Sequence, residues 1–401
     1  MLRKNAIVGQ SGGPTSVINA SLAGVINGCI KAEEIDRVYG AVYGIEGVLN
    51  ENIIDLTDKF SNEEELKLLK VTPASYLGSC RRKLKDEFKE IFDVFEKYDI
   101  GYFFYIGGND SMDTVMKLSH YAKDNNIPVK IVGVPKTIDN DLEITDHTPG
   151  FGSAAKFVAT TIKEIAHDAD VYDKTLVTII ETMGRNAGWL TAASALARDG
   201  IIDAPHLIYL PEIDFDVEKF IDDIVALSKT RKNIVVVVSE GISDKNGEYI
   251  LNLYKDTGKD AFGHTMLSGV CGILADIVKK RTGFKVKNVE FNILQRCCSH
   301  ISSKTDCDEA FEIGTKGVEA ALKGETGCMV YFHRTSNSPY ACEVKSISID
   351  KTANAVKLVP KEWITKEQND VTKEFIEYAL PLIQGETEIT YENGVPKYTV
   401  R

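Results

Sequence analysis

The chain has 401 residues, of which 43% are hydrophobic and 26% charged, and it carries a formal net charge of -12. This length predicts two domains, and the acidic balance argues against a nucleic-acid-binding surface, whose footprint is basic. No apolar run approaches the roughly 18 residues needed to cross a bilayer. The lack of a signal-peptide pattern, together with eight cysteines that show no C-x-x-C spacing, favours a cytoplasmic protein with reduced thiols.

The first predicted strand, residues 6–9, leads into a Gly12-Gly13 turn and then into an apolar helix predicted for 17–29. A strand, a glycine turn and a helix start in this order present backbone N–H groups and a helix dipole to an anion. The turn matches neither the dinucleotide fingerprint nor the P-loop. By itself, such a turn is more often only a tight connection.

A second strand is predicted for residues 38–44, and the loop at 77–83 that follows contains three consecutive cations, Arg81, Arg82 and Lys83. Such a run is usually only solvated. Because it follows Gly78-Ser79, contact with a phosphate is the second interpretation. The spacing of four apolar residues then predicts an amphipathic helix over 85–98.

A third strand, residues 101–106, opens into a second glycine loop, Gly107-Gly108-Asn109-Asp110-Ser111, before a helix that ends near residue 122. Asp110 is unexpected here, because a bare carboxylate repels a phosphate at close range. A metal could lie between them, a cation could neutralise the acid, with Lys136 the obvious candidate, or the acid could exclude a ligand. Helix capping by Asn109 or Ser111 is the alternative explanation of the loop.

The central stretch of the chain follows a buried strand predicted for residues 129–134. Pro135 ends the strand pairing because it has no backbone donor. Lys136, Thr137, Asp139 and Asp141 then come at the carboxyl end of a parallel strand, where open α/β sheets bind ligands. The alternative is a polar turn with solvated aspartates, and the two glycine loops argue against it.

The second half of the chain continues to alternate strands and helices, after a turn at Pro149-Gly150 that is a plausible hinge into a second domain. We predict helices at 154–169, 215–228, 262–280, 306–322 and 371–383, and strands at 175–181, 206–210, 234–238, 288–294, 329–333 and near 389. Arg185, at the end of one strand, suits a sugar phosphate because its planar fork matches phosphate geometry. This alternation predicts an α/β protein with two doubly wound, mostly parallel α/β/α domains.

The assembled motifs resemble the phosphofructokinase family in its pyrophosphate-dependent branch, over roughly residues 4 to 325. In the family's order they are Ser11-Gly12-Gly13, Gly78-Ser79-Cys80-Arg81, Gly107-Gly108-Asn109-Asp110-Ser111, Pro135-Lys136-Thr137-Ile138-Asp139-Asn140-Asp141, Met183-Gly184-Arg185, Ser239-Glu240-Gly241 and Leu294-Gln295-Arg296. The resemblance implies an active site in the cleft between the domains. The phosphoryl-donor domain would comprise residues 1–150 and about 295–345. The fructose 6-phosphate domain would comprise 151–294 and about 346–401.

The resemblance also implies residue roles, and with them a reversible transfer from pyrophosphate to the 1-hydroxyl of fructose 6-phosphate. Asp139 would be the general base, assisted by Lys136, Asp110 and Thr137. The diphosphate would contact Gly12, Gly13, Arg81, Gly108 and Ser111. The sugar phosphate would contact Thr137, Ile138, Asp139, Met183, Gly184, Arg185, Glu240, Ile293, Arg296 and Lys287. Mg²⁺ would be held by Asn109, Asp110 and Asp141, in a homodimer or homotetramer.

The identity of the donor depends on two positions. In the ATP-using branch, glycine stands where this chain has Asp110 and Lys136. A carboxylate at 110 would occupy the space, and carry the charge, that the α-phosphate of ATP needs, which is discrimination by an introduced repulsion. Lys136 would hold that carboxylate or the departing phosphate.

Three features depart from the family's pattern. Asn109 replaces a more usual acid, and Cys297-Cys298 replace a common Gly-Gly. Leu176 stands where the ATP branch has an arginine that reaches into a neighbouring subunit, so Lys174 and Lys287 are the substitutes we expect. The alternatives are an ATP-dependent phosphofructokinase, a non-catalytic regulatory subunit, and a lipid or nicotinamide-nucleotide kinase. The last would lack the sugar-site motifs.

Overall fold

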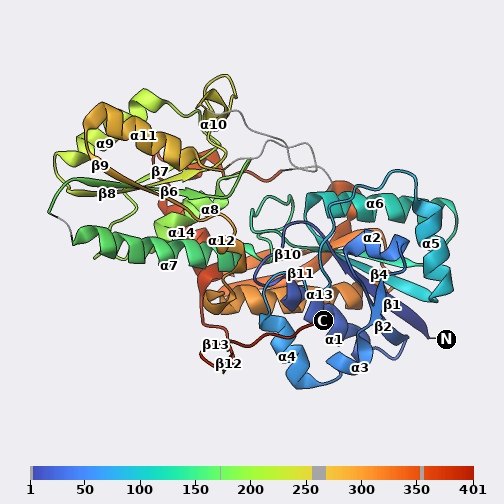
Figure 1. Cartoon of the computed structure of the whole chain (residues 1–401). Coiled ribbons are helices and arrows are strands. Elements are labelled where there is room, and N and C mark those ends of the chain that lie inside the picture. Colours follow the sequence, from blue (N-terminus) through green and yellow to red (C-terminus); the bar gives the residue numbers. More distant parts are fainter. Residues whose placement is uncertain (1–2, 172, 255–267, 353–355) are drawn as a thin grey trace.

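The computed structural model describes residues 3–171, 173–254, 268–352 and 356–401, and it contains two mainly parallel sheets in separate lobes (Figure 1). The larger sheet has seven strands in the order β11-β10-β5-β4-β1-β2-β3, and the smaller has four in the order β7-β8-β6-β9. In the larger sheet only the edge strands β3 and β11 pair antiparallel. The predicted α/β class with doubly wound, mostly parallel sheets is therefore present.

The strands of the larger sheet are β1 (Lys4–Gln10), β2 (Ile35–Ala41), β3 (Ile53–Asp55), β4 (Ile100–Gly107), β5 (Lys130–Pro135), β10 (Cys328–Asn337) and β11 (Tyr340–Ser348). The smaller sheet contains β6 (Leu176–Thr182), β7 (Leu207–Tyr209), β8 (Asn233–Ser239) and β9 (Lys285–Glu290). A separate hairpin near the carboxyl terminus pairs β12 (Tyr391–Glu392) with β13 (Val395–Pro396).

Helices cover both faces of the larger sheet, because its central strands are apolar on both sides. One face packs against α1 (Ile18–Lys31), α3 (Thr57–Phe60), α4 (Glu63–Val71) and α13 (Lys304–Leu322). The other packs against α2 (Gly44–Leu49), α5 (Phe88–Lys97) and α6 (Asn109–Asp124). Each face has its own buried cluster of apolar side chains, so the lobe has two core layers.

The smaller sheet is enclosed in the same way. Helices α9 (Val217–Ser228) and α11 (Val270–Thr282) cover one face, and α7 (Phe151–Asp170) covers the other. The lobe also contains α8 (Trp189–Ala193), α10 (Ile250–Tyr254), α12 (Leu294–Cys297) and α14 (Lys373–Ala379). Short 3₁₀ helices lie at Ser194–Ala197, Ser299–Ile301, Ile349–Lys351, Lys361–Trp363 and Leu380–Ile383.

Strand register brings the glycine loops together. Gln10 at the end of β1 pairs with Ile106, and Gly107 at the end of β4 pairs with Pro135 at the end of β5. The loops after these three strands therefore leave the same edge of the sheet side by side. In the smaller sheet, Thr182 of β6 likewise pairs with Ser239 of β8.

The prediction of a strand at residues 288–294 is wrong at the carboxyl end of that strand. The paired strand β9 ends at Glu290, Asn292 has a positive φ of 42°, and α12 begins at Leu294. The left-handed residue turns the chain out of the sheet, so Gln295 and Arg296 project from a short helix. The helix predicted for 262–280 is described only from Val270, since residues 255–267 lie outside the described part.

The carboxyl-terminal residues return to the first lobe, where the Thr399 amide donates to Thr72 Oγ1 at 3.1 Å. The sequence-based division placed this stretch with the second domain, and that division stays a prediction. Across the described ranges, none of the helices has both the length and the apolar character needed to span a bilayer.

Candidate active site

A cleft of about 410 Å³ lies between the lobes, at the carboxyl ends of β1, β4, β5, β6 and β8. Sixteen of the predicted site residues line it: Gly12, Gly13, Arg81, Gly108, Asn109, Asp110, Ser111, Lys136, Thr137, Ile138, Asp139, Asp141, Met183, Arg185, Glu240 and Arg296. Both sheets contribute side chains, so each lobe supplies one half of the site.

Some predicted residues lie elsewhere. The Gly184 amide contacts Glu240 Oε1 at 3.3 Å, which places it directly behind the cleft wall. Ile293 is half exposed on the turn after β9, and Lys287 forms an ion pair with Asp168 at 3.2 Å. Neither lines the cleft of this chain. Both stay predictions as contacts of the sugar phosphate, Lys287 as a contact made from a neighbouring subunit.

Several lining residues were not predicted, among them Arg82, Asn186 and Val356. Arg82 belongs to the run of cations that the sequence already showed. Val356 comes from the carboxyl-terminal segment, where no motif indicated a contribution to the site.

Asp139 lies partly buried in the turn after β5, where Thr137 Oγ1 accepts a hydrogen bond from its amide at 3.1 Å. Burial raises the pKa of Asp139, although Lys136, Arg185 and Arg296 oppose the rise. A carboxylate with a raised pKa is a stronger base than a free aspartate. The turn can therefore supply a general base at the centre of the cleft.

Lys136 is buried, and its Nζ donates to Gly13 O at 2.6 Å across the sheet edge. Burial lowers the pKa of Lys136 to about 8, against the attraction of Asp139 and Asp141. Gly12 has a positive φ of 78°, and a Cβ there would lie 3.2 Å from the same Nζ. The first glycine turn thus leaves room for the ammonium.

Asp110 does not form the predicted pair with Lys136. Its Oδ1 lies 3.1 Å from Lys83 Nζ, with both side chains about half exposed at the mouth of the cleft, while Lys136 donates to Gly13 instead. Because Asp110 lies in the first turn of α6 with its side chain half exposed, the flexible Lys83 reaches it from the cation loop. An exposed pair of this kind contributes about 0–1 kcal/mol, so it can open at little cost when a ligand enters.

Asn109 and Asp141 form the oxygen-rich corner of the cleft. Asn109 Nδ2 donates to Asp141 Oδ2 at 3.3 Å, while Asn109 Oδ1 is buried without a hydrogen-bond partner in the described structure. Burial, followed by the repulsion of Asp139, raises the pKa of Asp141 to about 7. An orphaned amide oxygen beside a carboxylate suits Mg²⁺, which binds one or two protein oxygens together with water and phosphate.

This corner has fewer ligands than an all-protein metal site. Within the described ranges no group of three or more His, Cys, Asp or Glu residues is arranged to hold a metal. Asp110, which the sequence also assigned to the metal, is engaged with Lys83. The residues present therefore fit Mg²⁺ only where phosphate oxygens complete its coordination.

The wall of the cleft that belongs to the second lobe includes Met183, Arg185, Glu240 and Arg296. Burial raises the pKa of Glu240 to about 8, helped by the charge of Asp139. Arg185 Nε is buried without a hydrogen-bond partner among the described residues, which is a donor available to a phosphate. A Cβ at Gly13 would lie 3.3 Å from Arg296 Nη1, so this side chain reaches from the second lobe to the first glycine turn.

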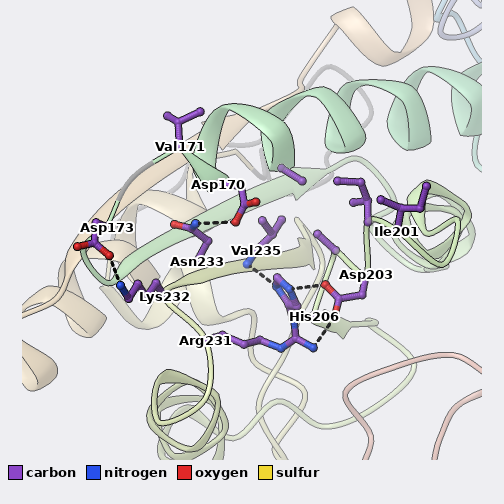
Figure 2. Close-up of a pocket in the computed structure, with 13 residues that line it drawn as sticks. Asp170, Val171, Asp173, Ile201, Asp203, His206, Arg231, Lys232, Asn233 and Val235 are labelled. Carbon is purple, nitrogen blue, oxygen red and sulfur yellow. Dashed lines mark hydrogen bonds and ion pairs between the residues drawn. The ribbon is translucent and has the colours of Figure 1, made fainter.

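A second hollow, of about 460 Å³, lies at the opposite end of the smaller sheet (Figure 2). Its charged groups already pair with one another, since Asp203 contacts both His206 and Arg231, and Lys232 contacts Asp173. It lies where β8 begins, away from the strand ends that carry the motifs. The chemistry of the chain is therefore concentrated in the interlobe cleft.

Comparisons with known proteins identify the family of this chain. The family model described as phosphofructokinase matches residues 5–321. The chain is 42% identical to the pyrophosphate–fructose 6-phosphate 1-phosphotransferase of Halomonas elongata and 39% identical to that of Methylococcus capsulatus. In both cases the match covers 99% of this chain and 96% of the relative. The crystal structure of the pyrophosphate-dependent phosphofructokinase from Nitrosospira multiformis superimposes with a TM-score of 0.90 at 38% identity, over 99% of this chain and 96% of that one.

Proposed function

Because this chain belongs to the phosphofructokinase family, we propose that it transfers a phosphoryl group reversibly between pyrophosphate and the 1-hydroxyl of fructose 6-phosphate. The products of the forward reaction are fructose 1,6-bisphosphate and phosphate. Relatives about 40% identical over nearly the whole chain carry the corresponding name. Pyrophosphate and fructose 1,6-bisphosphate have comparable phosphoryl potential, so the reaction runs in both directions.

The choice of pyrophosphate as the phosphoryl donor rests on two charged side chains on the first lobe's side of the cleft. Asp110 and Lys136 both line the cavity, at the positions where the ATP-using branch has glycine. The carboxylate of Asp110 carries the charge of an α-phosphate and repels a nucleotide, whereas pyrophosphate is short enough to fit in front of it. Lys83, not Lys136, balances this carboxylate.

The proposed site residues divide into three groups. Asp139 accepts the proton of the sugar's 1-hydroxyl as that oxygen attacks, and Thr137 helps to orient the reacting groups. Lys136 opposes the negative charge on the departing phosphate, and Arg81 and the two glycine turns hold the diphosphate. Met183, Gly184, Arg185, Glu240 and Arg296 bind fructose 6-phosphate. Phosphoryl transfer depends mainly on such alignment and charge stabilisation.

A magnesium ion fits the corner formed by Asn109 and Asp141. When bound there with the diphosphate, it would spread the charge of the transferring phosphoryl group. Homo-oligomerisation is part of the same proposal, because Lys287 does not line its own cleft and is a substitute we expect for the arginine that the ATP-using branch supplies from a neighbouring subunit. We place the enzyme in the cytoplasm.

The test is turnover by the purified protein with Mg²⁺, fructose 6-phosphate and pyrophosphate, followed in both directions. We expect Asp139→Asn to lower kcat by about 10²–10⁴-fold, because the base is lost while the shape is kept. Asp113→Asn is the control, since Asp113 lies on α6 and pairs with Lys117 at 2.7 Å. Absence of turnover with pyrophosphate, or full activity of Asp139→Asn, would contradict the proposal.

A further inference from the structure

A short segment at residues 356–359, beyond the 5–321 stretch matched by the family model, packs between the catalytic turn and the second lobe. The Lys357 amide donates to Asp141 O at 2.8 Å, and Lys357 O accepts from Trp189 Nε1 at 2.9 Å. The Val359 amide donates to Glu212 Oε1 at 3.0 Å, and the Gly188 amide donates to the same oxygen at 2.8 Å. This segment therefore connects the turn that carries the base with the wall that binds the sugar.

The side chain of Lys357 extends under the catalytic turn. Its Nζ donates to Asp146 O at 2.7 Å and to Thr145 O at 3.1 Å, and it lies 3.4 Å from Asn140 Oδ1. The same ammonium lies 5.0 Å from the centre of a Trp189 ring, within the range of a cation–π contact. One cation thus holds three points of the turn and touches the second lobe.

The turn needs such a cation because it is acidic and conformationally unfavourable. Asp139, Asp141, Glu143 and Asp146 lie within eight positions, and Asn140, between the base and the metal-side carboxylate, has a φ of 53°. A non-glycine residue in this left-handed region is held in place by its surroundings. Asn140 Nδ2 donates to Tyr378 OH at 2.8 Å, so a second residue beyond the family-model region also fixes it.

We propose that Lys357 is a positioning residue of the active site, whose ammonium holds the 140–146 turn so that Asp139 and Asp141 face the cleft. This inference rests on the proposed function for its kinetic consequence. Lys357 touches neither reacting group, so it acts through Asn140 and the carbonyls of the turn. Loss of its charge releases the turn while the sugar-binding residues of the second lobe stay in place.

A purely structural lysine provides the matched control. Lys156 Nζ donates to Gly385 O at 2.6 Å and contacts Glu386 at 2.8 Å, with a side chain 12% exposed. It therefore also anchors the carboxyl-terminal part of the chain, but through residues outside the cleft. If Lys357 only stabilised the fold, Lys357→Met and Lys156→Met would behave alike.

The experiment compares Lys357→Met, Lys357→Arg and Lys156→Met in the full chain by kinetics and by amide hydrogen exchange. We expect Lys357→Met to lower kcat by about 10–100-fold, as outer-shell and misplacement effects do. It should also raise the half-saturating Mg²⁺ concentration, with KM for fructose 6-phosphate unchanged. Lys357→Arg should recover part of kcat, and Lys156→Met should lower only the unfolding temperature.

Hydrogen exchange keeps the inference testable without turnover. In the free protein, Lys357→Met should speed exchange of the amides of residues 140–148, and Lys156→Met should not. If the wild-type protein proved inactive with pyrophosphate, the proposed function would fail. The hydrogen-exchange measurement would still decide whether Lys357 holds the 140–146 turn. Unchanged exchange in Lys357→Met, or kinetic losses shared equally with Lys156→Met, would overturn the inference.

Discussion

In the proposed function, a single half-exposed carboxylate selects the phosphoryl donor. Asp110 pairs with Lys83 at the mouth and carries the charge that an α-phosphate would bring. We expect Asp110→Gly to gain ATP-dependent turnover by about tenfold or more, because a like charge at close range costs several kcal/mol. Pyrophosphate turnover should persist, since Lys136 is unchanged. The measurement is kcat/KM for each donor.

Asp113→Gly is the control for this substitution. It also places a glycine in α6, which destabilises a helix, but it removes an ion pair with Lys117 that lies outside the cleft. It should leave the donor preference unchanged. An Asp110→Gly enzyme that still rejects ATP would show that this carboxylate does not select the donor.

Lys136 should set the alkaline limit of the reaction. Burial lowers its pKa to about 8, so its charge is present below that pH and lost above it. We expect kcat/KM for pyrophosphate to fall as the pH rises through about 8, because this parameter reports the free enzyme. Lys136→Arg should be slower but should move this fall to higher pH, since a guanidinium stays charged. Lys83→Arg is the control. If kcat/KM for pyrophosphate fell at the same pH in Lys136→Arg as in Lys83→Arg, this role of Lys136 would be contradicted.

At the residue scale, the sequence predicted which side chains meet but not all of their pairings. The motifs indicated most of the residues that line the cleft because most of these motifs follow a parallel strand, and such strands end at one edge. The Lys136–Asp110 pair was wrong because spacing along the chain does not determine which flexible cation reaches an exposed acid. Val356 and Lys357 were not predicted because they carry no motif and meet the turn only in the folded chain.

At the scale of elements, the first glycine turn depends on the contact between α1 and α13. A Cβ at Gly314 would lie 2.2 Å from Ser21 O, and one at Gly24 would lie 2.0 Å from Phe311 O. The two helix backbones therefore approach directly, and α1 begins two residues after the first glycine turn, residues 11–16. We expect Gly314→Ala to lower the free energy of unfolding by about 1–3 kcal/mol, measured by urea denaturation.

Gly272 provides the comparison, since a Cβ there would meet only Asn288 Nδ2 at 3.7 Å. Gly272→Ala in α11 should be neutral, or stabilising by up to about 1 kcal/mol, through helix propensity alone. If Gly314→Ala and Gly272→Ala lost the same free energy of unfolding, the contact between α1 and α13 would not explain the glycine at position 314.

The predictability of elements followed their burial. Strands β1, β4, β5, β6 and β8 are short apolar runs bounded by glycine or polar residues, and the sequence indicated each of them. The end of β9 was missed because Asn292 leaves the sheet through a left-handed conformation that apolar patterning does not show. The short helices α2, α3 and α4 gave no distinct apolar period to detect. Strand β11 does alternate between partly buried and exposed residues, but it is more polar than the central strands.

At the scale of the whole molecule, a buried histidine links the catalytic turn to α13 and β11. His147 lies between Asp146 at 2.9 Å and Glu309 at 2.8 Å, and Tyr340 donates to the other oxygen of Glu309. Burial opposes its charge, but Glu309 and Asp146 outweigh burial and raise the pKa of His147 to about 9. The stabilisation is therefore fully present below the unfolded pKa of about 6.5 and lost as the pH rises through about 9.

We expect His147→Gln to reduce stability more at pH 6 than at pH 9.5, by a difference of roughly 3 kcal/mol in the free energy of unfolding. Urea denaturation at the two pH values measures it. His120→Gln is the control, because His120 is exposed and, among the residues that the structure describes, pairs with Asp350 on the surface. A loss from His147→Gln that is the same at both pH values would rule out a charged histidine.

The two-lobe architecture could be predicted from strand–helix alternation, and the turn at Gly150 indeed leads into α7 of the second lobe. The path of the last residues back to the first lobe could not, because polar, alternating sequence does not specify its partner. The domain boundaries and the homo-oligomer stay predictions.

The central claim is that the two lobes enclose a diphosphate and exclude a nucleotide. The most direct test is kcat/KM of the wild-type protein for pyrophosphate and for ATP, at saturating fructose 6-phosphate and fixed free Mg²⁺. We predict a preference for pyrophosphate of about a hundredfold or more, because charge repulsion at Asp110 is worth several kcal/mol. Equal turnover with ATP would contradict the account.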